Sequence, residues 1–367
     1  MNRPISKSFK RVKPRISSSE RPGSGFIISP VADLFFIIGA PLVTLIIGSL
    51  LFSLPTSSFT VAIHERNVDL RQVFVAVFVN AHLFLVFFRS HANPAIFRMY
   101  PFRFIAVPLG MVVLGAMSPA VLGIMGLVGI WWDVYHSSLQ TFGFGRIYDS
   151  KQKNDATAGR ELDYLMNLLV YLGPVLAGAH FVDHLKIGVP HLDFLAMQES
   201  SLNDLLTNRT PAYLEQHQEY LAAAILAISV PFVMYYFYAY YQLMQQGYLV
   251  SWQKVWLMVI TSSVSIYCWG FHSFIDAFWV MNVFHALQYF AIVAFAEGRN
   301  LTQLFHLCRF RFGGTLAILW AISFSLLYGL WSWAFASGDW FVSMALTTSI
   351  MHYWYDGFIW SVKKKQV

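Results

Sequence analysis

Residues 35–54 read FFIIGAPLVTLIIGSLLFSL and include no charged side chain. A helix needs about 20 predominantly apolar residues to cross the hydrocarbon core of a bilayer, and this stretch has that length. It is longer than the apolar core of a signal peptide, and no small-residue cleavage pattern follows it. The stretch therefore predicts a first transmembrane helix that remains in the protein.

Similar apolar stretches recur along the chain. Hydrophobic residues make up 57% of the 367 residues and charged residues only 12%, whereas about a quarter of the residues of a soluble domain are charged. So few charges cannot cover a surface exposed to water. We predict an all-α protein, a polytopic membrane helix bundle with about ten transmembrane helices. The predicted spans lie near residues 32–54, 72–89, 104–117, 119–142, 161–181, 220–243, 254–272, 276–296, 314–336 and 341–361.

The distribution of charge indicates an even number of spans. Arginine and lysine in short loops favour the cytoplasmic side, and ten spans place the basic, disordered arm 1–30 and the basic tail 363–367 together there. The loop 182–218 is acidic and falls outside. We therefore predict that both termini are cytoplasmic and that residues 31–362 form one transmembrane domain. The net charge of +6 then reflects membrane orientation, and no nucleic-acid partner is expected. The basic loops on the inside are 90–103, 143–160 and 297–313.

Four predicted spans each carry a histidine. Ionisable residues within a span are costly, so each is a candidate functional residue that faces the bundle interior. The four are His82, His136, His285 and His352, and at 1.5 Å per helical residue their depths differ by about 10 Å. We predict that these imidazoles face one chamber and are metal ligands. The alternative is that each is only an interhelical hydrogen-bonding residue.

Further polar residues share helix faces with these histidines. Asp133, Gln288 and Asp356 each lie three or four residues from a histidine, a spacing that puts both side chains on one face. We predict that they orient the ligands or carry protons. Neutral imidazole suits iron, copper, zinc or nickel. A histidine-rich site with few carboxylates in a lipid-accessible chamber favours iron or copper oxygen chemistry over hydrolysis.

The fourth span ends in a glycine-rich segment. Gly143 and Gly145 are expected to end that helix and to let the backbone approach another element. Arg146 follows, either as a topology signal on the cytoplasmic side or as a group that binds an anionic head group. Six further histidines are expected on the solvated surface, five on the outer side and His306 in an inner loop; the five are His64, His180, His184, His191 and His217.

The set of His82, His136, His285 and His352 resembles that of the polyhistidine membrane oxygenases, in particular the bacterial β-carotene dioxygenases, whose transmembrane helices contribute histidines to one iron. The resemblance implies a non-haem iron oxygenase in the bacterial inner membrane. Its substrate would be lipid-soluble and would enter laterally from the bilayer. The histidine boxes of the fatty-acid desaturases are absent, because no two histidines are adjacent.

Two other functions stay open. In a haem-binding electron carrier or haem-modifying protein, histidines would form axial pairs beside small residues such as Gly129, although His82 and His285 lie among bulky neighbours. In a proton-coupled transporter, aspartate and histidine would relay protons. Transporters tend to show inverted repeats and broken helices, and the sequence indicates neither.

Overall fold

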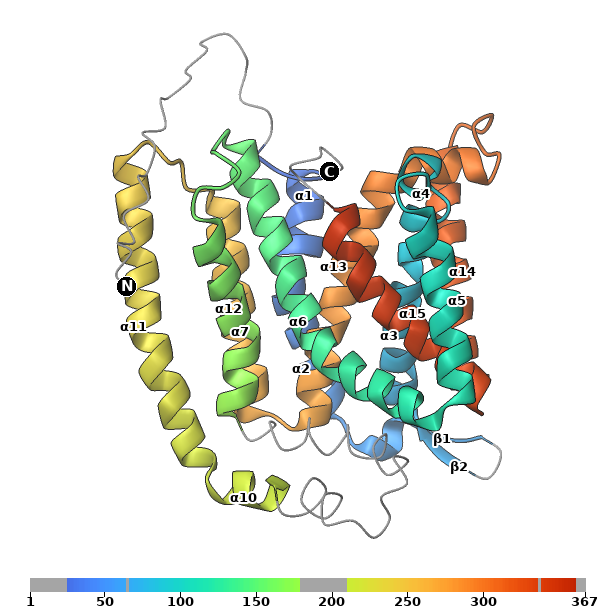
Figure 1. The fold of residues 1–367 in the computed structure, drawn as a ribbon, viewed down its shortest axis with the longest axis horizontal. Coiled ribbons are helices and arrows are strands. Elements are labelled where there is room, and N and C mark those ends of the chain that lie inside the picture. Colours follow the sequence, from blue (N-terminus) through green and yellow to red (C-terminus); the bar gives the residue numbers. More distant parts are fainter. Residues whose placement is uncertain (1–24, 64–65, 179–209, 336–337, 361–367) are drawn as a thin grey trace, which may run out of the picture.

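A computed structural model describes residues 25–63, 66–178, 210–335 and 338–360. Long helices dominate the described chain and run side by side in one bundle (Figure 1). A two-stranded antiparallel hairpin, β1 (Thr60–Ile63) and β2 (Arg66–Asp69), lies at one end. The long helices are α2 (Ala40–Ser53), α3 (Leu70–Ser90), α5 (Pro101–Met117), α6 (Pro119–Lys151), α7 (Arg160–Ala177), α11 (Gln218–Gln245), α12 (Trp252–Phe271), α13 (Phe274–Leu304), α14 (Gly313–Phe335) and α15 (Asp339–Ile359).

Short helical elements complete the described chain. They are α1 (Pro30–Asp33), the π-helix η1 (Leu34–Ile38), the 3-10 helix η2 (Thr56–Phe59), α4 (Pro94–Phe97) and α10 (Thr210–Gln216). The predicted arm 1–30, the outer loop 182–218 and the tail 363–367 lie wholly or largely outside the described residues.

Each predicted span coincides with one of the long helices. The described chain is mainly helical, so the all-α prediction is confirmed. Helices are expected because a chain in lipid must satisfy its backbone hydrogen bonds within each segment. Within the described chain, five helices are long and apolar enough to cross a membrane, or six if the bent pair α1–η1 and α2 is counted as one span. The apolar helix α5 is shorter. The protein is thus an integral membrane protein by the length and composition of these helices.

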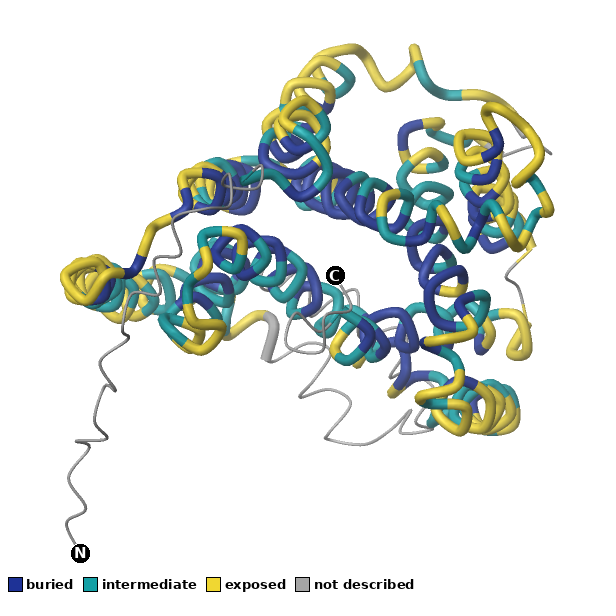
Figure 2. Tube along the Cα trace, turned by 90° about the horizontal axis from the view of Figure 1, so that it is seen from above, coloured by how far each residue is buried: buried dark blue, intermediate teal, exposed yellow. Residues whose placement is uncertain are grey.

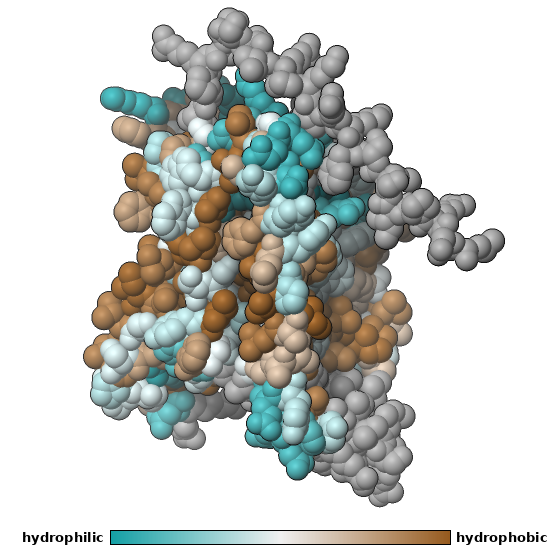
Figure 3. Space-filling model, turned by 90° about the vertical axis from the view of Figure 1, so that its left-hand side faces the viewer, coloured by the Kyte–Doolittle hydropathy of each residue, from teal (hydrophilic) through white to brown (hydrophobic). Residues whose placement is uncertain are grey.

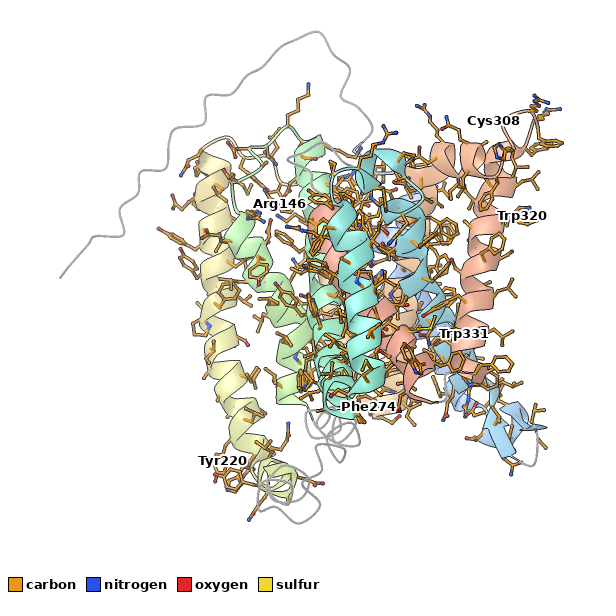
Figure 4. All side chains as sticks on the ribbon, turned by 45° about the vertical axis from the view of Figure 1, so that its right-hand side comes forward. Arg146, Tyr220, Phe274, Cys308, Trp320 and Trp331 are labelled. Atoms are coloured by element: carbon orange, nitrogen blue, oxygen red, sulfur yellow. The ribbon has the colours of Figure 1, made fainter. Side chains whose placement is uncertain are left out.

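The outer surface of the bundle is apolar around its middle. On the face drawn in Figure 3, hydrophobic residues gather over the central band and hydrophilic residues lie toward the two ends. Large apolar side chains such as Phe237 and Leu327 are more than half exposed. Figure 4 shows Arg146 and Cys308 at one end of the bundle and Tyr220 and Phe274 at the other. Buried residues line the inner sides of the helices (Figure 2).

The first predicted span is broken, so the expectation of unbroken helices is wrong. The segments Pro30–Ile38 and Ala40–Ser53 meet at an angle of 56°. Pro41 has no N–H, so the carbonyl of Ile37 has no partner four residues on. The amide of Gln288 on α13 donates to that carbonyl at 2.8 Å. The cause of the break, Pro41 two residues after Gly39, is visible in the sequence, whereas the partner of the Ile37 carbonyl is not.

The prediction that Gly143 and Gly145 end the fourth span is also wrong. Helix α6 continues through both glycines to Lys151. An interior glycine costs a helix about 1 kcal/mol relative to alanine, but Arg146 and Asp149 in the following turns form buried ion pairs. Arg146 is buried, so it does not present a free basic surface to the cytoplasm.

Candidate metal centre

The four histidines predicted from the spans gather in one cluster. His82 comes from α3, His136 from α6, His285 from α13 and His352 from α15, and the four residues are at most 2% exposed. Helix α15 packs against both α3 and α6, and α13 packs against α3. These three helix contacts turn the histidine faces toward one another.

The rings of the cluster touch edge to face. Their centroids are 5.1 Å apart for His82 and His285, 4.9 Å for His82 and His352, 5.0 Å for His136 and His285, and 4.7 Å for His136 and His352. The Nε2 atoms of His136 and His352 are 3.1 Å apart. With metal–nitrogen bonds of about 2.1 Å, neighbouring ligands on one ion are about 3.0 to 3.4 Å apart. The separation of these two atoms fits a shared ion.

The unpaired nitrogens of the cluster also fit a metal ion. Nδ1 of His82 lies 2.5 Å from the carbonyl oxygen of Val79 and must donate its proton there, which leaves Nε2 as a lone pair. That Nε2 atom, both ring nitrogens of His285 and Nδ1 of His352 are buried without a hydrogen-bond partner. A buried unpaired polar atom costs about 1–3 kcal/mol. One ligand atom each from His82, His285 and His352 lies within 4.8 Å of the others, close enough for one ion after small movements.

A carboxylate lies beside the cluster. Asp356 Oδ2 is 3.8 Å from Nε2 of His136 and 3.8 Å from Nε2 of His352. Its other oxygen, Oδ1, accepts hydrogen bonds at 2.9 Å from the Tyr289 hydroxyl and at 2.9 Å from the Trp360 indole. Asp356 therefore lies beside the two Nε2 atoms of His136 and His352, which face each other. A carboxylate that only oriented His352 would instead bond to its Nδ1 atom. It belongs with His136 and His352 as a candidate ligand group.

No protein-family model, curated protein or solved structure matches this chain.

The other two predicted polar residues, Asp133 and Gln288, bond to neighbours of the cluster. Asp133 accepts a hydrogen bond at 3.2 Å from the hydroxyl of Tyr353, whose ring is 4.9 Å from that of His136. Gln288 accepts a hydrogen bond at 2.9 Å from Gln140, which also donates to the carbonyl of His285. Gln140 thus supports the backbone of α13, and Gln288 supports that of the broken first span through the carbonyl of Ile37.

Two aromatic residues beside the cluster were missed by the sequence reasoning. Tyr289 packs at 4.6 Å from the ring of His352, and Trp360 hydrogen-bonds to Asp356. Both follow a predicted site residue by four positions, a spacing that puts them on its helix face. That spacing could have identified them.

His91 shows what a structural histidine looks like in this protein. It follows the last residue of α3, and its Nε2 donates to the carbonyl of Phe104 at 2.9 Å, while Nδ1 lies 2.7 Å from the Ser90 hydroxyl. Burial lowers the pKa of His91 below its usual value. Both nitrogens have protein partners, in contrast to those of His285.

Proposed function

We propose that His82, His136, His285 and His352 hold one iron ion, and that the protein is a membrane-embedded non-haem oxygenase that acts on a lipid-soluble substrate. The observation that carries the proposal is the convergence of four buried imidazoles from four helices, four of whose ring nitrogens have no hydrogen-bond partner. Neutral imidazole is a good ligand for iron and copper. Copper is the alternative metal.

The surrounding residues have separate roles in this proposal. Bound iron would supply activation of dioxygen. Tyr289 and Trp360 hold Oδ1 of Asp356, so that Oδ2 faces the histidines and can bind the ion or hold a proton beside it. Tyr353 links Asp133 to the edge of the His136 ring. The resemblance to the β-carotene dioxygenases makes a conjugated polyene the first substrate to assay.

The ring contacts favour a single ion over haem. A haem held by two axial histidines lies between their rings. Here the rings already touch, with centroids 4.7–5.1 Å apart, and the ring of Tyr289 lies 4.6 Å from that of His352. A macrocycle would have to separate the four helices.

The metal content and visible spectrum of the purified protein test this proposal. We expect about one iron per chain after purification in detergent or after reconstitution with Fe(II), because a four-imidazole site binds it directly. We expect no Soret band. A Soret band would favour the haem alternative, and a protein that retains no transition metal after reconstitution would contradict the metal site.

One observation supports a second candidate, a proton-coupled transporter. Broken helices are common at transporter binding sites, and the first span is bent by 56°. The carbonyl freed by that break is, however, bonded to Gln288. A metal-free protein that catalyses proton-linked uptake into vesicles would favour this candidate.

We also propose that the chain crosses the bacterial inner membrane ten times with both termini in the cytoplasm. The proposal is supported by ten helices at the predicted positions and by the position of basic loops. A reporter fused after Val367 is expected to read as cytoplasmic, and one inserted near Asn203 as external, because arginine and lysine hold their loops inside. Reporters on the same side would mean that the number of spans between them is even.

A further inference from the structure

A second candidate site lies away from the histidines. A cavity of about 830 Å³ separates α7, α11 and α12, which stand together at the left of Figure 1. Its volume is within the range of about 300–1,000 Å³ that is typical of small-molecule sites. No histidine lines it. Its walls are mainly apolar and include Val170, Pro174, Leu226, Val233, Met258 and Ile266.

One part of the cavity wall is polar. Lys254 and Tyr240 line it, and Lys254 is only 4% exposed. The Lys254 ammonium donates to Asp149 Oδ2 at 2.8 Å, to Asp163 Oδ2 at 2.7 Å and to the Tyr240 hydroxyl at 2.6 Å. All three donors of the ammonium group are therefore in use.

The charges behind this wall balance. The Arg146 guanidinium donates to Asp149 Oδ2 at 3.1 Å and to Asp163 Oδ2 at 2.7 Å. Two cations and two carboxylates from α6, α7 and α12 thus form one buried network with no formal net charge. Buried charges are tolerated when they are paired in this way. The network leaves no excess positive charge to attract an anionic head group.

Three hydroxyl groups of the cavity wall have their protons in use and keep only the capacity to accept. The Tyr236 hydroxyl donates its only proton to Asp163 Oδ1 at 3.0 Å, and a phenolic oxygen also accepts. The hydroxyls of Ser229 and Ser262 donate to carbonyls of their own helices at 2.6 Å each. These three side chains line the cavity. A ligand group that hydrogen-bonds to any of these three hydroxyls must therefore be a donor.

We propose that this cavity binds an uncharged long-chain alcohol, with its chain between α11 and α12 and its hydroxyl group donating to Tyr236. The apolar walls fit the chain, the neutral network disfavours a carboxylate or phosphate head, and the acceptor at Tyr236 fits a hydroxyl. Arg146 follows His136 by ten residues on α6, about 15 Å along the helix axis. The site is independent of the proposed metal centre and can fail or succeed separately.

Photolabelling of the full-length protein in detergent with diazirine-bearing hexadecanol tests the proposal. We expect saturable labelling of α7, α11 or α12 that unlabelled hexadecanol displaces and hexadecanoate at pH 8 does not. Tyr236→Phe keeps the ring and removes the acceptor, so affinity should fall about two- to tenfold, as for one lost hydrogen bond. Tyr235→Phe is the matched control, because Tyr235 is 56% exposed and does not line the cavity.

A second variant tests the cavity and keeps the hydrogen bond from Tyr236 to Asp163. Ser262→Phe should fill the space and abolish the saturable labelling, with an unchanged size-exclusion profile as the check on folding. Labelling spread over the whole apolar surface, equal displacement by hexadecanoate, or equal affinity of the Tyr236→Phe and Tyr235→Phe proteins would overturn the proposal.

Discussion

Replacing His285 with alanine should remove nearly all bound metal from the purified protein. His285 is fully buried, touches the rings of both His82 and His136, and has no protein partner for either ring nitrogen. Its loss opens a gap in the centre of the ligand set that no neighbouring side chain fills. The measurement is metal per chain by elemental analysis after reconstitution with Fe(II).

Two histidine variants are matched controls for this result. His91→Ala and His217→Ala should both keep the metal content of the unaltered protein. His91 is hydrogen-bonded through both nitrogens, and His217 packs on Tyr213 with Nδ1 2.8 Å from its carbonyl. Equal metal in the His285 and His217 variants would remove the site.

Asp356→Asn should give an intermediate result in the same experiment. The asparagine keeps the size of the side chain and loses the negative charge beside His136 and His352. Loss of a group that supports a metal site costs about 10- to 100-fold in affinity. Lower thermal stability with unchanged metal affinity would instead assign Asp356 a structural role.

Arg89→Ala should be the most destabilising single change outside the histidine cluster. Arg89 on α3 and Glu297 on α13 are 3% and 0% exposed and are paired at 2.5 Å. Arg89 also donates to the carbonyl of Ile359 and stacks 3.6 Å from the ring centroid of Trp360. Truncating one partner of a buried pair leaves an uncompensated charge and costs about 3–5 kcal/mol. Unfolding in detergent by a denaturing surfactant measures this loss.

The double variant decides whether the charge is the cause. Arg89→Met with Glu297→Met removes both charges and should recover most of the lost stability, because a buried pair replaced by apolar residues is often neutral. Arg299→Ala, at an exposed position of α13, should stay within about 0.5 kcal/mol of the unaltered protein. A double variant as unstable as Arg89→Ala would show that the lost packing, and not the unpaired carboxylate, causes the effect.

The Arg89 variant has a second consequence at the metal centre. Trp360 stacks on Arg89 and donates to Asp356, so the guanidinium helps to hold the carboxylate that faces His136 and His352. We therefore expect weaker metal binding by the Arg89→Ala protein, and also by a Trp360→Phe protein, which keeps most of the ring and loses the indole N–H.

Two polar residues at membrane depth, Asp163 and Lys254, were not among the predicted site residues. Asp163 and Lys254 lie within predicted spans, and the rule that selected the histidines also applies to them. They were overlooked, although they pair at 2.7 Å beside the cavity. The rotation of a helix about its axis decides which of its polar residues faces a neighbouring helix. The spacing of residues along the sequence does not determine that rotation.

The sequence by itself determined where the helices lie. A helix in lipid satisfies its own backbone hydrogen bonds, so its position follows from a local apolar run, and each predicted span is mainly helical over its described residues. The tertiary structure alone decided the continuation of α6 past Gly145, the partner of the Ile37 carbonyl, and the meeting of four imidazoles at contact distance. Each of these depends on side chains from helices that are far apart in the sequence, because lateral packing sets how each helix is rotated and tilted against its neighbours.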